Sequence, residues 1–372
     1  MLERLRFPLA ESRGRRYPEQ PHPYRSDFQR DRDRIVHARA FRRLEDKTQV
    51  FSEPNSDHFR NRLTHTIEVS QIARTVASTL GLDEDLTEAL ALAHDFGHPP
   101  FAHAGEAELN RQMARFGERF DHNLHALRLV EGFEQRYARF PGLNLTFEVR
   151  EGMVKHSRDF ENGEFPELDE YLPGQRPPLE AQLIDLADEI AYCTADLDDA
   201  FEAGILAIDE IAGSVPKYGA IQEAIETQFP GAPPRIQFLE GLRLLIDWLV
   251  TGLIRGTADA ARQSGVDSSE EVRHYPQRLA RLAVEPSETA AQLKRLLYAR
   301  VYNSAALQQE RDKSMVQVAG LFEYFLNQPS AMPEPYSMLV HQQDAHRVVC
   351  DYIAGMTDGF LRKTVRHLKL EV

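Results

Sequence analysis

Apolar residues recur three and four positions apart through most of this 372-residue chain, which is the spacing of an amphipathic α-helix. The clearest segments run from about residue 61 to 80, from 85 to 93 and from 179 to 203. A glycine follows each segment closely and can end a helix there. We find no segment that alternates apolar and polar residues as a half-buried strand does. The pattern predicts an all-α fold with at most a short β-hairpin.

Three further segments have helical spacing. One runs from 26 to 44, where Ser26 and Asp27 can cap its first turn. The others run from about 106 to 116 and from about 123 to 137. Each is long enough for at least two helical turns.

We expect the chain to have three parts. Residues 1–25 hold four prolines and many arginines, which predicts an extended basic arm. Residues 26–215 contain the strongest helical segments and predict a helical core. Residues 216–372 predict further helices that pack on this core, interrupted by proline-rich breaks.

The charge of the chain is negative overall but unevenly distributed. There are 44 lysines and arginines against 58 aspartates and glutamates, a formal net charge of −14, which argues against a general nucleic-acid binder. Twelve arginines nevertheless lie within residues 1–43. They favour either contact with phosphates, of nucleotides or single-stranded DNA, or a solvated arm or subunit contact.

The hydrophobic pattern predicts no membrane span. No run reaches the roughly 18 apolar residues that a membrane helix needs, and charged residues interrupt the apolar stretch from 238 to 254. Cys193 and Cys350 give neither a disulfide framework nor the paired spacing of a metal site. We therefore expect both thiols to be reduced and buried, which is typical of a cytoplasmic protein.

Histidine and aspartate meet where His94-Asp95 closes the 85–93 segment. Imidazole nitrogen beside carboxylate oxygen suits a divalent metal ion, but an adjacent pair cannot form a complete site. His65 and Asp188 lie on two other predicted helices and can supply the missing ligands. Each residue alone could instead make an ordinary buried hydrogen bond. The four together predict a metal site with open positions for water and a phosphate oxygen.

The order of these residues over three helices resembles the signature of the HD phosphohydrolase superfamily. Other segments are similar to the deoxyguanosine triphosphate triphosphohydrolase family: Lys47-Thr48-Gln49-Val50-Phe51, residues 61–69, residues 147–152, residues 186–192 and residues 351–358. The similarity covers roughly residues 25–358, which is almost the whole chain.

This resemblance implies a fold, a reaction and a cofactor. Residues 26–215 would form an HD-domain catalytic core, with the C-terminal helices packed on it. The protein would hydrolyse a deoxynucleoside triphosphate to the deoxynucleoside and inorganic triphosphate, by attack at the α-phosphorus. It would use one divalent ion, and the ligands do not select among Mn, Mg, Fe, Co and Ni. Family members are usually homo-oligomers, and some need a deoxynucleotide activator.

His103 and Glu106 match family positions that are implicated in catalysis rather than in metal binding. They lie three residues apart at a predicted helix start, so they can share one face. A carboxylate beside an imidazole orients the ring and raises its basicity. His103 would then act as acid, base or nucleophile, with Glu106 as its orienter. The ordinary alternative is a capping glutamate and a loop histidine.

Three further residues match family positions that contact the substrate. His98 and His122 match positions that approach the phosphates or the leaving group. Gln49 matches the position that bonds the 3′-hydroxyl and excludes ribose. Ordinary polar loop residues are the alternative for the two histidines.

Helical spacing adds three more candidate contacts. Arg62 precedes His65 by three residues, so it can reach the same site and clamp a phosphate, with a surface ion pair as the alternative. Tyr192 and Asp196 follow Asp188 on its helix face. Tyr192 could pack under the deoxyribose or simply in the core, and Asp196 could accept from the 3′-hydroxyl.

Two residues on the same face, Asp185 and Asp199, have no role in this interpretation and are expected to be solvated.

Two other functions also stay open. One is an HD-type phosphohydrolase for another nucleotide, against which Gln49, Tyr192 and Asp196 argue. The other is a deoxynucleotide sensor or DNA-binding regulator with weak activity, against which the intact His103 and Glu106 argue. We find no residue that predicts a base preference.

Overall fold

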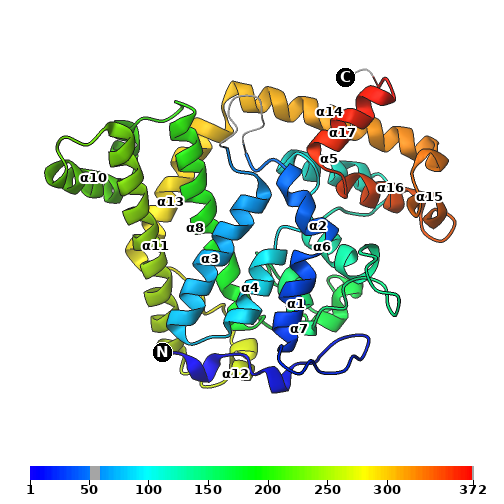
Figure 1. The fold of residues 1–372 in the computed structure, drawn as a ribbon, viewed down its shortest axis with the longest axis horizontal. Helices are drawn as coiled ribbons and strands as arrows, with labels where there is room; N and C mark the ends of the chain where they lie inside the picture. The colour runs from blue at the N-terminus through cyan, green and yellow to red at the C-terminus, as the bar shows by residue number, and fades with distance from the viewer. Residues whose placement is uncertain (51–58, 371–372) are drawn as a thin grey trace.

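The computed structural model describes residues 1–50 and 59–370, which form a bundle of helices (Figure 1). Within these ranges the β-structure consists of two isolated bridges, from Arg15 to Thr146 and from Thr48 to Asn61. The all-α prediction is therefore confirmed. Part of the predicted family segment 47–51 lies outside the described residues, because Phe51 does.

The α-helices are, in chain order, α1 (Asp27–Val36), α2 (Arg39–Arg43), α3 (Arg62–Leu80), α4 (Glu84–Ala93), α5 (Ala102–Ala114), α6 (His122–Arg128), α7 (Phe147–Val154), α8 (Leu179–Glu202), α9 (Ile208–Ser214), α10 (Pro216–Gln228), α11 (Pro234–Ser264), α12 (Ser269–His274), α13 (Val284–Leu297), α14 (Ala305–Asn327), α15 (Tyr336–Leu339), α16 (Ala345–Ala354) and α17 (Asp358–His367). The short 3-10 helices are η1 (Glu3–Leu5), η2 (Leu9–Glu11), η3 (Leu44–Asp46), η5 (Pro166–Tyr171) and η7 (Pro329–Ala331). Two π-helices, η4 (Leu129–Phe133) and η6 (Tyr298–Tyr302), continue α6 and α13.

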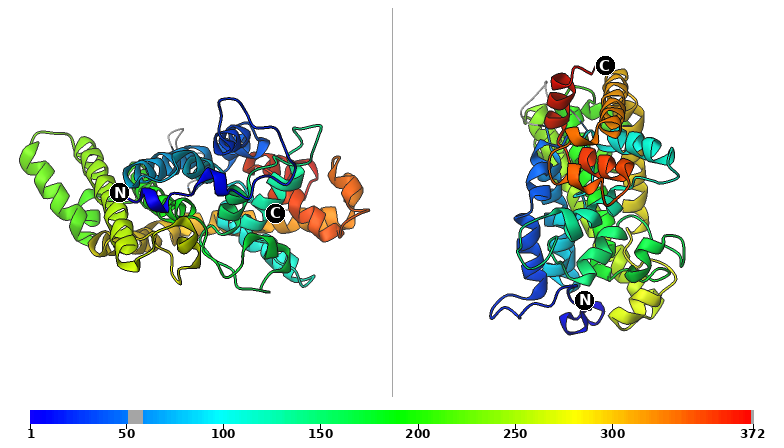
Figure 2. Two further views of the ribbon diagram at one scale, coloured as in Figure 1. Left: turned by 90° about the horizontal axis from the view of Figure 1, so that it is seen from below. Right: turned by 90° about the vertical axis from the view of Figure 1, so that its right-hand side faces the viewer.

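The helices α3, α4 and α8 form the centre of the molecule, since each packs against the other two (Figure 1). The helix α1 packs on α4, and α11 and α13 pack on α8. A hydrophobic cluster runs through all of these helices. A second cluster joins α5 to α14, α16 and α17. Figure 2 shows α10 at one end of the long axis and α15 at the other.

Local sequence accounts for the boundary between α3 and α4. The Asn61 side chain accepts the Thr64 N–H at 2.9 Å, and the Thr64 hydroxyl accepts the Asn61 N–H at 3.1 Å, which caps α3. The helix ends at Gly81, whose φ of 83° lies in the left-handed region that favours glycine. Asp83 then caps α4 by accepting the Leu86 N–H at 2.9 Å. These caps fix where the two helices begin and end.

The prediction of a single helix over 26–44 is wrong, because α1 ends before Ala38 and α2 begins after it. The buried carboxylate of Glu134 explains the break. It accepts the N–H of Arg39 at 3.1 Å and that of Ala40 at 2.7 Å, both in the first turn of α2. Because Glu134 is distant in the sequence, the local spacing of apolar residues gives no sign of this cap.

Two other predicted helices differ at their ends. The helix expected from about residue 106 begins at Ala102, so His103 lies in the first turn of α5. The helix expected over 123–137 is α6 followed by the π-helix η4, and it ends at Phe133.

The N-terminal segment is packed against the core. Leu2, Leu5 and Phe7 are at most 4% exposed, and the Phe7 N–H donates to the buried Glu180 at 2.9 Å. Arg15 pairs with the buried carboxylate of Asp31. The solvated-arm interpretation is therefore wrong for these residues.

None of the helices in the described ranges is both long and apolar enough to cross a membrane. Both cysteines are buried and unpaired, as the sequence predicts.

We expect Phe7→Ala to lower the free energy of unfolding by about 3–5 kcal/mol, because it removes a buried ring and leaves a cavity. Chemical denaturation followed by circular dichroism measures this change. Tyr24→Ala is the control, since Tyr24 is 81% exposed and its truncation should cost less than about 0.5 kcal/mol. Equal effects of the two substitutions would mean that the N-terminal segment is detached in solution.

Candidate active site

Four side chains, from α3, α8 and the two residues directly after α4, meet near the centre of the fold. The ligand atoms of His65, His94 and Asp95 all lie within 4.8 Å of one another, and all three residues are buried. An oxygen of Asp188 lies 2.8 Å from Nε2 of His65 and 3.8 Å from Nε2 of His94. The structure thus brings together the four predicted metal ligands.

The histidine His94 is oriented for a role as a ligand. Its Nδ1 lies 2.6 Å from the carbonyl oxygen of Ala91, so this nitrogen carries the hydrogen and donates it. The other nitrogen, Nε2, is buried without a hydrogen-bond partner and faces the carboxylates of Asp95 and Asp188. Burial lowers the pKa of His94, which favours the neutral form. A buried, unpartnered imidazole nitrogen among carboxylates fits a divalent ion.

The loop after α4 lies directly against α6. A β-carbon on Gly97 would come within 1.7 Å of the carbonyl oxygen of His122, so only glycine fits here.

Burial alone would raise the pKa of Asp95, but Arg62, His94 and the other nearby imidazoles hold this pKa well below its usual range. The Arg62 guanidinium donates to Asp95 at 2.7 Å. Arg62 therefore already has a carboxylate partner at this site.

A second group of histidines surrounds Glu106. Its carboxylate lies 2.7 Å from Nδ1 of His122 and 3.6 Å from Nδ1 of His103. The rings of His98 and His122 have their centroids 4.0 Å apart and are tilted by 32°, and Nδ1 of His98 lies 3.0 Å from Asp95. The polar groups thus form a continuous path from the metal ligands to His103.

The electrostatics of this group favour an ionised glutamate. Burial opposes ionisation of Glu106, but hydrogen bonds from His103 and His122 lower its pKa below the usual value. Burial and the nearby Arg62 guanidinium hold the pKa of His98 well below its usual range, so His98 is neutral. The side chain of His103 is 83% exposed, which leaves its far nitrogen accessible to a bound molecule.

A cavity of about 520 Å³ opens beside His103. Gln49, Arg62 and Tyr192 line it together with His103, whereas His98 and His122 do not. Other parts of its wall were not predicted: Thr48, Val50, Phe101, Ala102, Ala104, Ala107, Tyr298, Tyr302, Leu307, Glu310, Arg311, Ser314, Met315 and Arg362. The cavity therefore combines the helix that carries His103 with the C-terminal helices.

The environment of Asp196 differs from the one that its predicted role as a sugar contact needs. It is 1% exposed, and the Tyr302 hydroxyl donates to its Oδ2. Burial raises the pKa of Asp196 to about 7. Tyr302 lines the cavity whereas Asp196 is not part of its wall. The tyrosine hydroxyl thus occupies the acceptor that was expected to receive a sugar hydroxyl.

The expectation that Asp185 and Asp199 are solvated is wrong. Asp185 pairs with His156 at 2.7 Å and with Arg278, and Asp199 pairs with Arg60 at 2.7 Å. His156 was missed altogether, although its Nε2 lies 3.8 Å from Asp188. Asp185 and Asp188 raise the pKa of His156 to about 10 against the effect of burial. The only sequence signal for His156 was its position just after a short helix.

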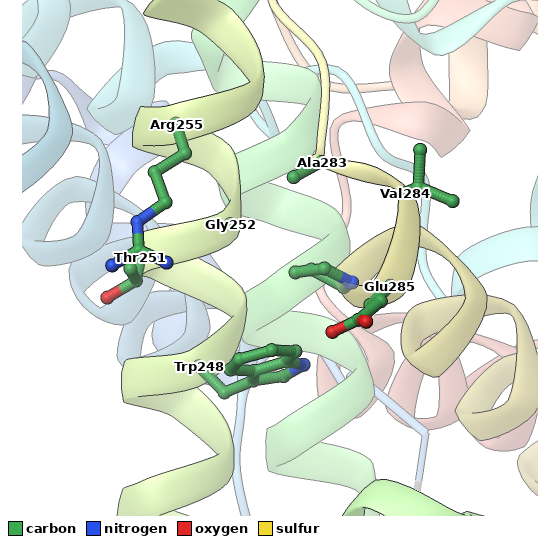
Figure 3. Close-up of a pocket in the computed structure, with 8 residues that line it drawn as sticks. Trp248, Thr251, Gly252, Arg255, Ala283, Val284 and Glu285 are labelled. Carbon is green, nitrogen blue, oxygen red and sulfur yellow. The ribbon is translucent and has the colours of Figure 1, made fainter.

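A separate pocket of about 190 Å³ lies between α11 and the start of α13 (Figure 3). Trp248, Arg255 and Val284 line it, and it shares no residue with the cavity beside His103. A β-carbon on Gly252 would lie 2.3 Å from Pro286, so the two helices approach closely there. No histidine lines this pocket, which separates it from the chemistry described above.

Comparisons with known proteins agree with this geometry. The HD domain family matches residues 62–193, and the phosphohydrolase-associated domain family matches residues 281–367. The chain is 43% identical to a deoxyguanosinetriphosphate triphosphohydrolase-like protein of Geobacter sulfurreducens, over 94% of this chain and 90% of the relative. Relatives with the same name from Ralstonia nicotianae (43% identical; 96% and 92% covered) and Caulobacter vibrioides (41%; 98% and 96%) are also similar.

We expect Asp95→Ala to lose bound metal, because it removes a buried carboxylate from the cluster. Elemental analysis of the purified protein, loaded with each candidate divalent ion, measures this. Asp85→Ala is the control, since Asp85 lies on α4, the helix just before Asp95, but pairs with Arg32 outside the cluster. Full metal content in Asp95→Ala would exclude Asp95 as a ligand.

Proposed function

Because the chain belongs to the deoxyguanosinetriphosphate triphosphohydrolase-like family of HD phosphohydrolases, we propose that it hydrolyses deoxynucleoside triphosphates to the deoxynucleoside and inorganic triphosphate. The observation that carries this proposal is the exposed His103, which faces Glu106 and lines a cavity that Gln49 also lines. The path of polar groups from His103 to Asp95 supports a joint action on one phosphate group.

The proposed cofactor is one divalent ion held by His65, His94, Asp95 and Asp188. Two neutral imidazoles and two carboxylates balance its charge, and Mn, Mg, Fe, Co and Ni all suit this set. When bound, the ion polarises a phosphate oxygen and offsets the negative charge of the triphosphate.

The proposed proton chemistry belongs to His103. Its Nδ1 faces Glu106, so its Nε2 is the atom available to the substrate. Attack of water at the α-phosphorus breaks the bond to the 5′-oxygen, and this oxygen must receive a proton. His103 can take a proton from the attacking water or deliver one to the 5′-oxygen. The ionised Glu106 stabilises the charged imidazole at either stage.

The proposed sugar contacts are Gln49 and Tyr192. The side-chain oxygen of Gln49 is buried and has no hydrogen-bond partner, which suits a hydroxyl donated by a ligand. The ring of Tyr192 stacks on Tyr302 with centroids 6.1 Å apart, so the wall beside it is aromatic and firmly placed. Together they would favour a deoxyribose over a bulkier ribose.

A sensor or DNA-binding regulator is less well supported. Several N-terminal arginines that could have contacted phosphates are paired within the chain, including Arg15 with Asp31 and Arg34 with Glu19. Turnover of the four deoxynucleoside triphosphates, singly and in pairs and with each metal, tests the proposed activity. The homo-oligomer, the deoxynucleotide activator and the cytoplasmic location stay predictions.

We expect His103→Ala to keep its metal and to bind substrate, because His103 is outside the metal cluster. Its turnover should fall by a factor on the order of 10²–10⁴, the range for a lost acid–base group. Metal content, nucleotide binding and turnover are measured on the same preparation. His274→Ala, which truncates a surface histidine of α12, is the control. Near-normal turnover of metal-loaded His103→Ala would exclude this role.

We expect Gln49→Ala to reduce the preference for deoxynucleotides over ribonucleotides. The variant opens space and removes a polar contact that is typically worth about 1–3 kcal/mol. The ratio of kcat/KM for a deoxynucleoside triphosphate and its ribonucleotide measures the effect, with Gln71→Ala on the exposed face of α3 as control. An unchanged ratio with reduced activity would show that Gln49 does not read the sugar.

A further inference from the structure

One buried carboxylate at the start of α17 joins two segments of the cavity wall. Asp358 is 3% exposed. Its Oδ2 accepts the N–H of Thr48 at 3.0 Å, and its Oδ1 accepts the N–H of Phe101 at 3.0 Å. Each oxygen therefore holds the backbone of a different segment, and both segments are far from Asp358 in the chain.

The two segments carry the residues with the proposed chemical roles. Thr48 directly precedes Gln49, the proposed sugar contact. Phe101 directly precedes α5, whose first turn carries His103. The distance between the sugar contact and the acid–base group thus depends on how these two backbone segments are held.

The segment before α5 needs such support. Phe101 has a φ of 63° and Ala102 a φ of 51°, a left-handed conformation that residues with a β-carbon rarely adopt. The Phe101 side chain does not cap α5. The hydrogen bond to Asp358 instead holds the backbone N–H of Phe101 in place. Unusual backbone of this kind persists only where the surroundings hold it.

Separate contacts join the same parts of the chain. The Lys47 ammonium group is buried and donates to the carbonyl oxygen of His98 and, at 3.4 Å, to that of Ala354. The Arg362 guanidinium, one turn beyond Asp358, lies 5.0 Å from the centre of the Phe101 ring. The attachment of α17 to this wall is thus made by more than one residue.

We propose that Asp358 is a positioning residue that fixes the Gln49 segment and the His103 helix relative to each other, a role that rests on the proposed function. Through Asp358 the C-terminal helices set the geometry in which a deoxynucleotide is bound and hydrolysed. Asp358 is buried and is not part of the cavity wall, so it acts through the backbone of the two segments and not on the substrate.

The test is Asp358→Asn. An asparagine offers one acceptor oxygen where two N–H groups need acceptors, so one segment is released while the size of the side chain is kept. Turnover with a deoxynucleoside triphosphate should fall between about 10- and 100-fold, as expected for a small misplacement of reacting groups. The preference for deoxynucleotides over ribonucleotides should fall as well, while metal content stays at the wild-type level. A loss of fold stability alone would not change this preference.

Two matched variants sharpen the test. Asp344→Asn changes the exposed aspartate that precedes α16 and should leave both the preference and turnover unchanged. Asp358→Glu keeps the charge and both oxygens and should recover part of the preference. An Asp358→Asn enzyme with wild-type turnover and wild-type preference would overturn the proposal.

Hydrogen exchange of the wild-type protein provides a measurement that does not depend on a stable variant. The amides of Thr48 and Phe101 should both be protected, and they should open together because they share one carboxylate. Rapid exchange at Thr48 beside a protected Phe101 would overturn the proposal. This result is independent of turnover, so a wild-type protein that fails to hydrolyse deoxynucleotides would overturn the proposed function without deciding the role of Asp358.

Discussion

The site depends on the close contact between Gly97 and the backbone of α6. Since a β-carbon at this position would meet a carbonyl oxygen at 1.7 Å, the loop after α4 can press against α6 only without a side chain. A similar approach occurs at Gly105, where a β-carbon would lie 1.9 Å from the carbonyl oxygen of Pro100. The Gly97 contact brings the proposed metal ligands that follow α4, His94 and Asp95, close to His122 on α6.

Charged groups are buried around this contact, and the structure pairs them. Asp95 is paired with Arg62, and Asp351 is paired with His125 and Arg128. A buried charge without a partner is costly, so each of these pairs restricts where its helices can lie. Nε2 of His94 lies among these charges, buried and without a hydrogen-bond partner, near the carboxylates of Asp95 and Asp188. An imidazole nitrogen placed in this way fits a ligand for a divalent ion.

The sequence predicted the parts of the site that depend on local spacing. His94-Asp95 at the end of a periodic segment, with His65 and Asp188 on neighbouring helices, could be found because each lies on a regular helix. The break at Ala38 could not, because its cause is Glu134, almost one hundred residues away. The partner of Asp196 could not be found either, because Tyr302 is 106 residues away in the chain and local spacing does not reveal such a contact. Long-range polar contacts thus account for most of the differences.

The two hydrophobic clusters hold different groups of candidate site residues. The helices α3 and α8 and the turn after α4, which carry the proposed metal ligands, belong to one cluster, whereas α5, which carries His103 and Glu106, packs with α14 and α16 in the other. A small rotation of one cluster against the other would change the distance between the proposed metal site and His103, with each half left intact. Under the proposed function, any ligand that binds more tightly to one relative orientation would therefore alter the rate without contacting either group of residues. The arrangement would let such a ligand control this protein from a distance.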